Sequence, residues 1–204
     1  MNHVVEVSHL SKSFGQEEVL KNINIKYETG KIHGIVGRNG SGKTVLMKCI
    51  LGFLKPTQGS VSVFGKKIGI DCDFAPKTGM IIETPGFLPT ESGYHNLKWL
   101  LGLRGVKSKN LIEEVMNQVG LNPTSKKPVG KYSLGMRQRL GIAQAIMETP
   151  RLLVLDEPMN GLDNQGVADM RKLFLDLRQK GVTILLASHN PLDIDALCDT
   201  ISQM

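Results

Sequence analysis

The stretch Gly37-Arg38-Asn39-Gly40-Ser41-Gly42-Lys43-Thr44 decides the fold of this chain. It fits the pattern G-x-x-x-x-G-K-[ST], in which glycines let consecutive backbone N–H groups turn toward phosphate oxygens. The Lys43 ammonium can reach the outer phosphates, and the Thr44 hydroxyl can ligate Mg²⁺. All eight residues are therefore candidate nucleotide-binding residues. Lys43 is also a candidate catalytic group.

The two flanks of this loop have the patterns that a phosphate-binding loop requires. Residues 31–36 (KIHGIV) predict a strand that runs into the loop, and residues 44–54 (TVLMKCILGFL) predict a helix that leaves it. Bound phosphates would then lie at a helix N-terminus, where backbone N–H groups and the helix dipole favour anions. A glycine-rich turn without a ligand is the alternative. The order of strand, loop and helix argues against it.

Length and composition fit one globular domain. The chain has 204 residues, 41% of them apolar and 22% charged, which is enough for one sizeable core. The net charge of +6 arises from scattered basic residues, so a polyanionic nucleotide and solvated helix faces account for it and no nucleic-acid partner is expected. Cys49, Cys72 and Cys198 are far apart and odd in number, which favours reduced thiols. We expect neither a secretory signal nor a membrane span.

The periodicity of apolar residues changes twice along the chain. Alternation over residues 4–7, 23–27 and 61–64 predicts a small antiparallel sheet around the loop, with a turn at residues 12–15. From about residue 91 to residue 148, apolar residues recur at helical spacing. After Pro150 the pattern returns to strands and helices in alternation, and the strands are apolar throughout.

The apolar runs 152–155 and 182–187 predict strands buried on both faces, and helical stripes follow each of them. Strands with helical crossovers imply a parallel sheet, whose ligands bind at the carboxyl ends of the strands. Asp156 and Glu157 come directly after the first run, and Ser188-His189 follows the second. Asp156 is thus a candidate Mg²⁺ ligand, and Glu157 a candidate base for an attacking water.

The passage Tyr132-Ser133-Leu134-Gly135-Met136-Arg137-Gln138-Arg139 resembles the signature of ABC ATPases, usually Leu-Ser-Gly-Gly-Gln followed by basic residues. Residues 157–163 (EPMNGLD) are similar to that family's passage from the Walker B motif to the D-loop, and Ser188-His189 resembles its switch histidine. These motifs occur in family order over nearly the whole chain. The sequence therefore resembles the ATPase subunits of ABC transporters.

The resemblance implies an α/β fold of the P-loop NTPase type, a RecA-like parallel sheet core with an antiparallel β lobe and an inserted α-helical lobe. Residues 1–204 would form a single ABC ATPase domain, in which residues 1–83 and 151–204 make the β lobe and the core. Residues from about 84 to 150 would make the helical lobe. Family members usually continue beyond the helix that follows the switch histidine, so we expect the C-terminus to be short of the family's usual length.

The resemblance also implies an activity: binding and hydrolysis of ATP with Mg²⁺ by two copies of the chain, arranged head-to-tail around two nucleotides. The P-loop of one copy would face Ser133, Gly135, Met136 and the D-loop residue Asp163 of the other. Independently of the family, Ser133 precedes an expected helix start, which is an anion site. His189 would contact the γ-phosphate. The ATPase would drive a separate permease, exporting a peptide or drug-like substrate, from the cytoplasmic face of the membrane.

The fit to the family pattern also depends on four other positions. Phe14 falls where the family places an aromatic ring that stacks on adenine, and an ordinary buried ring is the alternative. In the signature, Leu134 and Met136 replace the usual glycine and glutamine. Glu83 stands where the family usually has the glutamine of the Q-loop, so we expect it to act in catalysis and near the metal while adding a negative charge there. Residues 82–87 (IETPGF) are similar to ATPases of bacitracin and lantibiotic exporters.

Two other functions fit part of the pattern. One is an ABC-type ATPase that acts on nucleic acid or ribosomes, although such relatives usually carry coiled-coil insertions or two ATPase modules. The other is an ATP-binding regulator whose altered signature has lost turnover. The presence of Lys43, Glu157 and His189 argues against the second.

Overall fold

The computed structural model describes residues 2–83 and 86–204; Met1, Thr84 and Pro85 lie outside the described residues. In chain order the elements are β1 (His3–Phe14), β2 (Glu17–Glu28), β3 (Ile32–Val36), α1 (Lys43–Leu51), β4 (Gln58–Val63), β5 (Lys66–Lys67), β6 (Thr78–Ile81), α2 (Gly93–Leu103), α3 (Lys109–Gln118), the 3₁₀ turn η1 (Val129–Lys131), α4 (Leu134–Ile146), β7 (Leu152–Asp156), α5 (Asn164–Gln179), β8 (Thr183–Ala187), α6 (Pro191–Leu197) and β9 (Thr200–Gln203).

The central element is a five-stranded sheet in the order β6-β7-β8-β3-β9, and each of its strand pairs is parallel. Its strands β7 and β8 are apolar and buried, as expected of parallel strands that are covered on both faces. Because β8 lies between β7 and β3, the three segments that follow these strands emerge side by side at one edge. Those segments are the acidic pair, the switch histidine and the P-loop.

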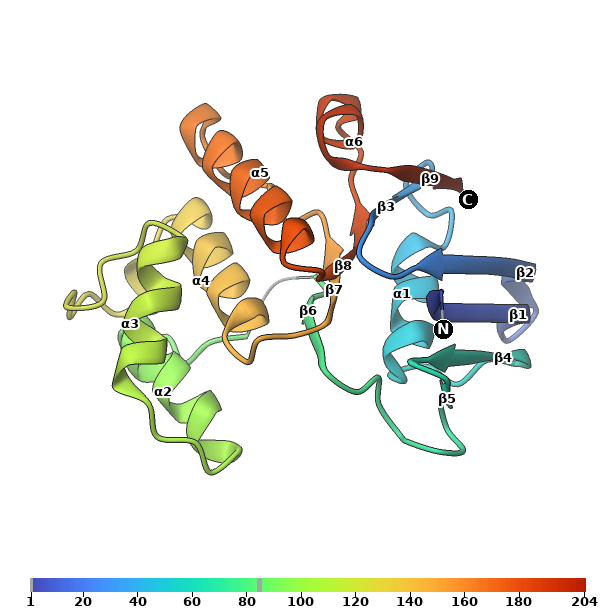
Figure 1. The fold of residues 1–204 in the computed structure, drawn as a ribbon, viewed down its shortest axis with the longest axis horizontal. Coiled ribbons are helices and arrows are strands. Elements are labelled where there is room, and N and C mark those ends of the chain that lie inside the picture. The colour runs from blue at the N-terminus through green and yellow to red at the C-terminus, as the bar shows by residue number, and fades with distance from the viewer. Residues whose placement is uncertain (1, 84–85) are drawn as a thin grey trace.

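A second, antiparallel sheet has the order β2-β1-β4-β5. Helix α1 packs between the two sheets, in contact with β2 and β4 on one side and β7 on the other (Figure 1). Its buried residues Leu46, Met47 and Ile50 share one apolar core with Val5 of β1 and Val154 of β7. The helix that leaves the P-loop is therefore held firmly on both sides, which fixes the loop in front of it.

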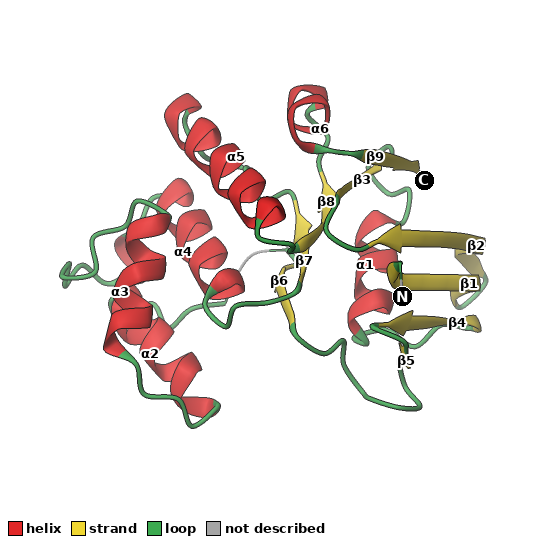
Figure 2. Cartoon of the chain, in the orientation of Figure 1, coloured by secondary structure: helices red, strands yellow, loops and turns green. Residues whose placement is uncertain are grey.

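Helices α2, α3 and α4 form a separate group on one side of the molecule, away from the antiparallel sheet (Figure 2). Leu97, Ile112 and Leu140 come from these three helices and belong to one buried cluster. The same cluster includes Phe174 of α5 and Leu186 of β8, because α4 and α5 also cover the face of the parallel sheet opposite α1. The helical group is thus continuous with the core of the sheet.

The α/β fold class that the sequence predicts is confirmed, with its parallel sheet, antiparallel sheet and group of helices. Two local predictions were wrong, and one strand was missed. The turn predicted at residues 12–15 is displaced, because Ser13 and Phe14 still pair with β2 and the chain turns at Gly15 and Gln16. The helix predicted over residues 44–54 ends at Leu51. Strand β9 was not predicted, because it is short and polar and pairs only with β3.

Gly52 explains the early end of α1. Its φ of 91° is in the left-handed region, and its N–H donates to the Cys49 carbonyl while Phe53 N–H donates to the Lys48 carbonyl. A Cβ at this position would overlap the backbone oxygen of Asp73. The apolar run continues past Gly52, so periodicity alone extends the predicted helix by three residues.

Candidate functional site

A cavity of about 560 Å³ opens at the carboxyl-terminal edge of the parallel sheet. Its walls come from the P-loop, from the ends of β6 and β7, and from the first turn of α4. The lining residues are Val19, Asn39, Gly40, Gly42, Lys43, Thr44, Val45, Glu83, Leu134, Arg137, Gln138, Asp156, Glu157 and Asn160. Eight of them were predicted as site residues from the sequence. The cavity therefore joins segments that are more than a hundred residues apart.

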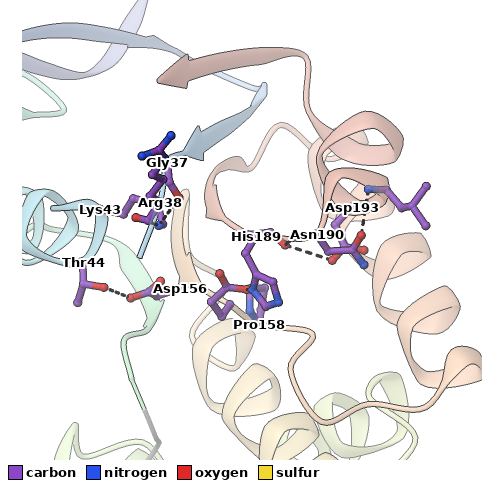
Figure 3. Close-up of polar contacts among 12 residues, drawn as sticks. Gly37, Arg38, Lys43, Thr44, Asp156, Pro158, His189, Asn190 and Asp193 are labelled. Atoms are coloured by element: carbon purple, nitrogen blue, oxygen red, sulfur yellow. Dashed lines mark hydrogen bonds and ion pairs between the residues drawn. The ribbon is translucent and has the colours of Figure 1, made fainter. Parts of the chain in front are cut away.

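The P-loop presents a buried cation to this cavity. Lys43 is 8% exposed, and its ammonium donates hydrogen bonds to the carbonyls of Gly37 at 2.8 Å and Arg38 at 3.1 Å (Figure 3). Both acceptors are neutral, so the positive charge of Lys43 is available to an anionic ligand. In the described part of the chain, the buried Ser41 hydroxyl has no hydrogen-bond partner. A buried cation and a buried hydroxyl in one loop fit a bound polyphosphate.

Thr44 and Asp156 place two oxygen atoms together at the wall of the cavity. The Thr44 hydroxyl at the start of α1 donates to the Asp156 carboxylate at the end of β7, with an oxygen–oxygen distance of 2.5 Å (Figure 3). Mg²⁺ prefers oxygen ligands and usually takes one or two from the protein, with water and phosphate oxygens completing the shell. This pair fits such an ion.

Glu157 and His189 meet beside the same wall. Glu157 has a φ of 49°, and its N–H donates to the Ala187 carbonyl of β8 at 2.9 Å. A non-glycine residue in the left-handed region is strained, and such strain is concentrated at functional sites. The turn leaves the Glu157 carboxylate 2.8 Å from Nδ1 of the His189 ring. A carboxylate that lines the cavity is therefore held by an imidazole from the neighbouring strand.

Gln138 fixes the backbone that carries Glu157. Its buried side-chain amide donates to the Pro158 carbonyl at 2.8 Å, across from α4 to the segment after β7. No role for Gln138 follows from the sequence motifs. The available signal was its place directly after the signature, on the face of the helix that also carries Leu134 and the cavity-lining Arg137.

Glu83 also lines the cavity, but its surroundings differ from those expected. Its carboxylate lies 2.6 Å from the ammonium of Lys48 on α1. Lys48 therefore compensates the negative charge of Glu83, and the expected role of Glu83 near the metal stays a prediction. No sequence motif points to Lys48, because the two residues belong to different elements and lie 35 positions apart.

The signature residues occupy the start of α4. The Ser133 hydroxyl accepts the N–H of Met136 at 3.2 Å and so caps the helix. Gly135 lies against the backbone of Gly161, where a Cβ would be 2.8 Å from the carbonyl oxygen. The Met136 side chain does not line the P-loop cavity; it borders a separate hollow of about 400 Å³ with Tyr132, Arg139 and neighbouring residues.

Asp163 and Phe14 lie outside the lining of the cavity. Asp163 caps α5, its carboxylate accepting the N–H of Gly166 at 2.8 Å. The Phe14 ring is 48% exposed, and the Lys12 ammonium lies 5.0 Å from its centroid. The alternative of an ordinary buried ring is therefore wrong. The ring lies at the end of β1, where about half of its surface is open to solvent.

This geometry can be compared with known proteins. Residues 20–160 match the model of the family described as ABC transporter. The chain is 44% identical to the bacitracin transport ATP-binding protein BcrA of Enterococcus faecalis, an alignment that covers 100% of this chain and 67% of that protein. It is 37% identical to the lantibiotic transport ATP-binding protein SrtF of Streptococcus pyogenes, with 97% of this chain and 85% of that protein covered. The narrower resemblance seen in the sequence is thereby confirmed.

Solved structures give the same fold. The ATP-binding cassette MJ0796, a dimer bound to ADP and Pi, superposes with a TM-score of 0.88 at 24% identity and covers 98% of this chain and 94% of that chain. CbiO1 of Clostridium perfringens, part of the ABC transporter complex cbiONQ, has a TM-score of 0.84 at 26% identity and covers 100% of this chain and 85% of that chain. Together with the family match, these likenesses place the chain in the ABC transporter family, as an ATP-binding subunit that hydrolyses ATP.

Proposed function

We propose that this chain hydrolyses MgATP as one half of a head-to-tail dimer and so drives a separate membrane permease that exports a peptide of the bacitracin or lantibiotic class. The observation that supports it best is the contact of His189 with Glu157, which lines the same cavity as Lys43 and the Thr44–Asp156 pair. A base, a cation and a pair of metal ligands are the parts that phosphoryl transfer to water requires.

Each residue has a separate role in this mechanism. Lys43 binds the β- and γ-phosphates through its ammonium and holds the phosphoryl group in line with the attacking water. The Glu157 carboxylate accepts the proton of that water, and His189 orients the carboxylate and contacts the γ-phosphate. Thr44 and Asp156 would hold Mg²⁺, with Glu83 at the edge of the same site. When bound, Mg²⁺ neutralises charge on the phosphate oxygens.

The dimer supplies the part of the site that one chain lacks. Ser133 stands at the N-terminus of the 13-residue helix α4, where unpaired N–H groups attract an anion. One chain already has a complete phosphate cradle in its P-loop. Ser133, Gly135, Met136 and Asp163 are therefore proposed to face the γ-phosphate bound by a second copy, and Phe14 to stack on the adenine of its own nucleotide.

The permease is proposed to dock on an apolar hollow of the helical group. Phe87, Leu88, Trp99, Leu100 and Leu103 line this hollow of about 370 Å³. Trp99 is 64% exposed and Leu103 82% exposed, which is unusual for side chains of this size unless a partner covers them. Within the described residues, no helix is both long and apolar enough to cross a membrane. Docking there would place the ATPase at the cytoplasmic face, next to the Glu83 loop.

The Glu157→Gln variant tests the catalytic part. Without its base the enzyme should lose about 10²- to 10⁴-fold in turnover, while the neutral side chain still permits the sandwich. We expect MgATP to convert the variant into a stable dimer, measured by light scattering after gel filtration, and ADP to leave it monomeric. Unchanged hydrolysis would reject Glu157 as the base. A variant that stays monomeric with MgATP would reject the sandwich.

Two further measurements test the partner. The permease should co-purify with the wild-type ATPase, and the double change Trp99→Ser and Leu103→Ser should abolish this without altering the ATPase activity of the isolated chain. The alternatives of an ATPase acting on nucleic acid and of a turnover-deficient regulator are not favoured, because the relatives are transport ATP-binding proteins. Stimulation of hydrolysis by DNA or RNA, with no permease recovered, would instead support an ATPase that acts on nucleic acid.

A further inference from the structure

We propose that the ion pair between Arg171 and the buried Asp193 positions His189 for ATP hydrolysis, acting through the hydroxyl of Ser188. The inference rests on the role of His189 proposed above and extends it to Ser188 and to Arg171 and Asp193, two residues that no motif marks. Arg171 lies on α5, Asp193 on α6, and Ser188 directly after β8.

The ion pair joins a buried carboxylate to a partly exposed guanidinium. Asp193 is 3% exposed, and its Oδ1 accepts hydrogen bonds from Nε of Arg171 at 3.0 Å and from Nη2 of the same guanidinium. A buried carboxylate is stable only when its charge is compensated and its lone pairs are bonded. The two-bonded guanidinium meets that need and also fixes the direction of the carboxylate. Asp193 is thus a rigid acceptor.

The second oxygen of Asp193 is directed at residues 188–190, which we call the switch segment. Its Oδ2 accepts the Ser188 hydroxyl at 3.2 Å, and the oxygen of that hydroxyl in turn accepts the N–H of Asn190 at 3.2 Å. The Ser188 hydroxyl therefore links the residues on either side of His189 to each other, and it also links them to Asp193. The Asn190 carbonyl is also engaged, because it accepts the Asp193 N–H at 3.1 Å.

This arrangement holds the backbone on both sides of His189 and does not engage its ring. The ring points toward the Pro158 segment and away from Asp193 (Figure 3). There Nδ1 lies 2.8 Å from the Glu157 carboxylate, and 62% of the side chain is exposed. A displacement of about 1 Å at a reacting group can cost on the order of a hundredfold in rate. The anchored turn prevents such a displacement, which makes Arg171, Asp193 and Ser188 positioning residues.

A second ion pair, Arg178–Asp199, also joins α5 to the segment around α6 but does not contact residues 188–190. Arg178, also on α5, lies 2.7 Å from Asp199, which follows α6. The other oxygen of Asp199 accepts the N–H of Ile32, far from the switch segment. Arg178–Asp199 thus joins the same two parts of the chain without touching residues 188–190. It provides a matched control for Arg171–Asp193.

The central test uses Ser188→Ala, which removes one hydroxyl and leaves the ion pair in place. We expect kcat for ATP hydrolysis to fall by about tenfold to a hundredfold. The affinity for fluorescent ADP, which lacks the γ-phosphate, should stay within about twofold of wild type. Arg171→Gln should behave in the same way, whereas Arg178→Gln should keep wild-type kcat.

A double-mutant cycle with His189→Ala separates positioning from general destabilisation. If Ser188 acts through His189, adding Ser188→Ala to His189→Ala should change kcat by less than about twofold. An equal loss in both backgrounds, or wild-type kcat in Ser188→Ala, would overturn the inference. If His189→Ala alone leaves hydrolysis unchanged, the proposed role of His189 is wrong instead. The kcat of Arg171→Gln is compared with wild type only after a urea unfolding curve shows that the variant is folded.

Discussion

The ammonium of Lys48 lies 2.6 Å from the carboxylate of Glu83, so the helix that leaves the P-loop is bound to the loop that follows β6. Lys48 belongs to α1, whose first residues Lys43 and Thr44 line the cavity, and Glu83 lines the same cavity. The resemblance to ABC ATPases implies a neutral glutamine at this position. A carboxylate there is compatible with a negatively charged nucleotide because Lys48 neutralises it.

The first prediction follows from this pair. Lys48→Met removes the compensating charge and leaves Glu83 to attract a divalent cation, so half-maximal hydrolysis should need less Mg²⁺ than in wild type. Glu83→Gln removes the carboxylate and should require more. The Mg²⁺ concentration at half-maximal ATPase activity measures both, and the dissociation constant of Mg²⁺ with the bound non-hydrolysable nucleotide gives a second readout.

Lys31→Met is the control for the loss of one lysine. Lys31 pairs with Glu28 at 2.7 Å, away from the nucleotide cavity, and its loss should leave the Mg²⁺ dependence unchanged. The pairing would be irrelevant to the metal if Lys48→Met and Lys31→Met gave the same Mg²⁺ titration as wild type.

The second prediction compares two helix caps. Ser133 caps α4, and Ser108 caps α3 by accepting the N–H of Leu111 at 3.3 Å. Changing either to alanine should lower the free energy of unfolding by about 1 kcal/mol, because one N–H at the helix start loses its partner. Only Ser133→Ala should also weaken the MgATP-dependent dimer, by about tenfold or more, since it removes a hydrogen bond to a charged phosphate.

Urea unfolding measures the free energy of unfolding of each variant. Sedimentation with MgATP measures the dimer, with each serine change made in the Glu157→Gln protein. A dimer weakened equally by Ser108→Ala and Ser133→Ala would mean that the loss comes from the stability of the helices and not from a contact across the dimer.

The third prediction concerns the contact between β6 and α4. A Cβ on Gly79 would overlap the carbonyl oxygen of Ala145, so Gly79→Ala must push the helix and strand apart. Overpacking of this kind costs about 1–3 kcal/mol. Gly102 on α2 has open space at the same position, and Gly102→Ala should stabilise the protein by about 0.5–1 kcal/mol. Thermal unfolding of the two variants should shift in opposite directions, and equal shifts would contradict the close approach.

The fourth prediction is a loss of stability at high pH. Tyr27 is 1% exposed, and burial raises the pKa of its phenol from the usual 10.0 to about 12. The folded state therefore holds the phenolic proton after the unfolded state has lost it. This contribution is fully present below pH 10 and is lost as the pH rises through 12. Over this pH range the free energy of unfolding of Tyr27→Phe should thus fall by up to about 3 kcal/mol less than that of wild type.

Denaturant unfolding at several alkaline pH values measures the difference. Tyr94→Phe, on the half-buried ring beside His95, is the matched substitution. Parallel stability curves for wild type and Tyr27→Phe above pH 10 would show that the phenol does not contribute to the alkaline loss.

The motifs could be predicted from the sequence because their chemistry is local. A P-loop needs its glycines, lysine and threonine within eight consecutive residues, and a buried parallel strand needs an unbroken apolar run. Both signals stand in Gly37–Thr44 and in residues 152–155. Helix ends were less well predicted, since α1 ends where Gly52 turns left-handed and not where the apolar residues stop.

The sequence by itself thus determined the fold class, the family and eight of the fourteen residues that line the cavity. The tertiary structure alone decided which charges meet: Lys48 with Glu83, and Arg171 with Asp193 behind Ser188. The physical reason is distance along the chain. These partners come from separate elements that only the packing of the sheets and helices brings within hydrogen-bonding range, and hydrogen-bonded contact acts over about 3 Å whatever the spacing in sequence.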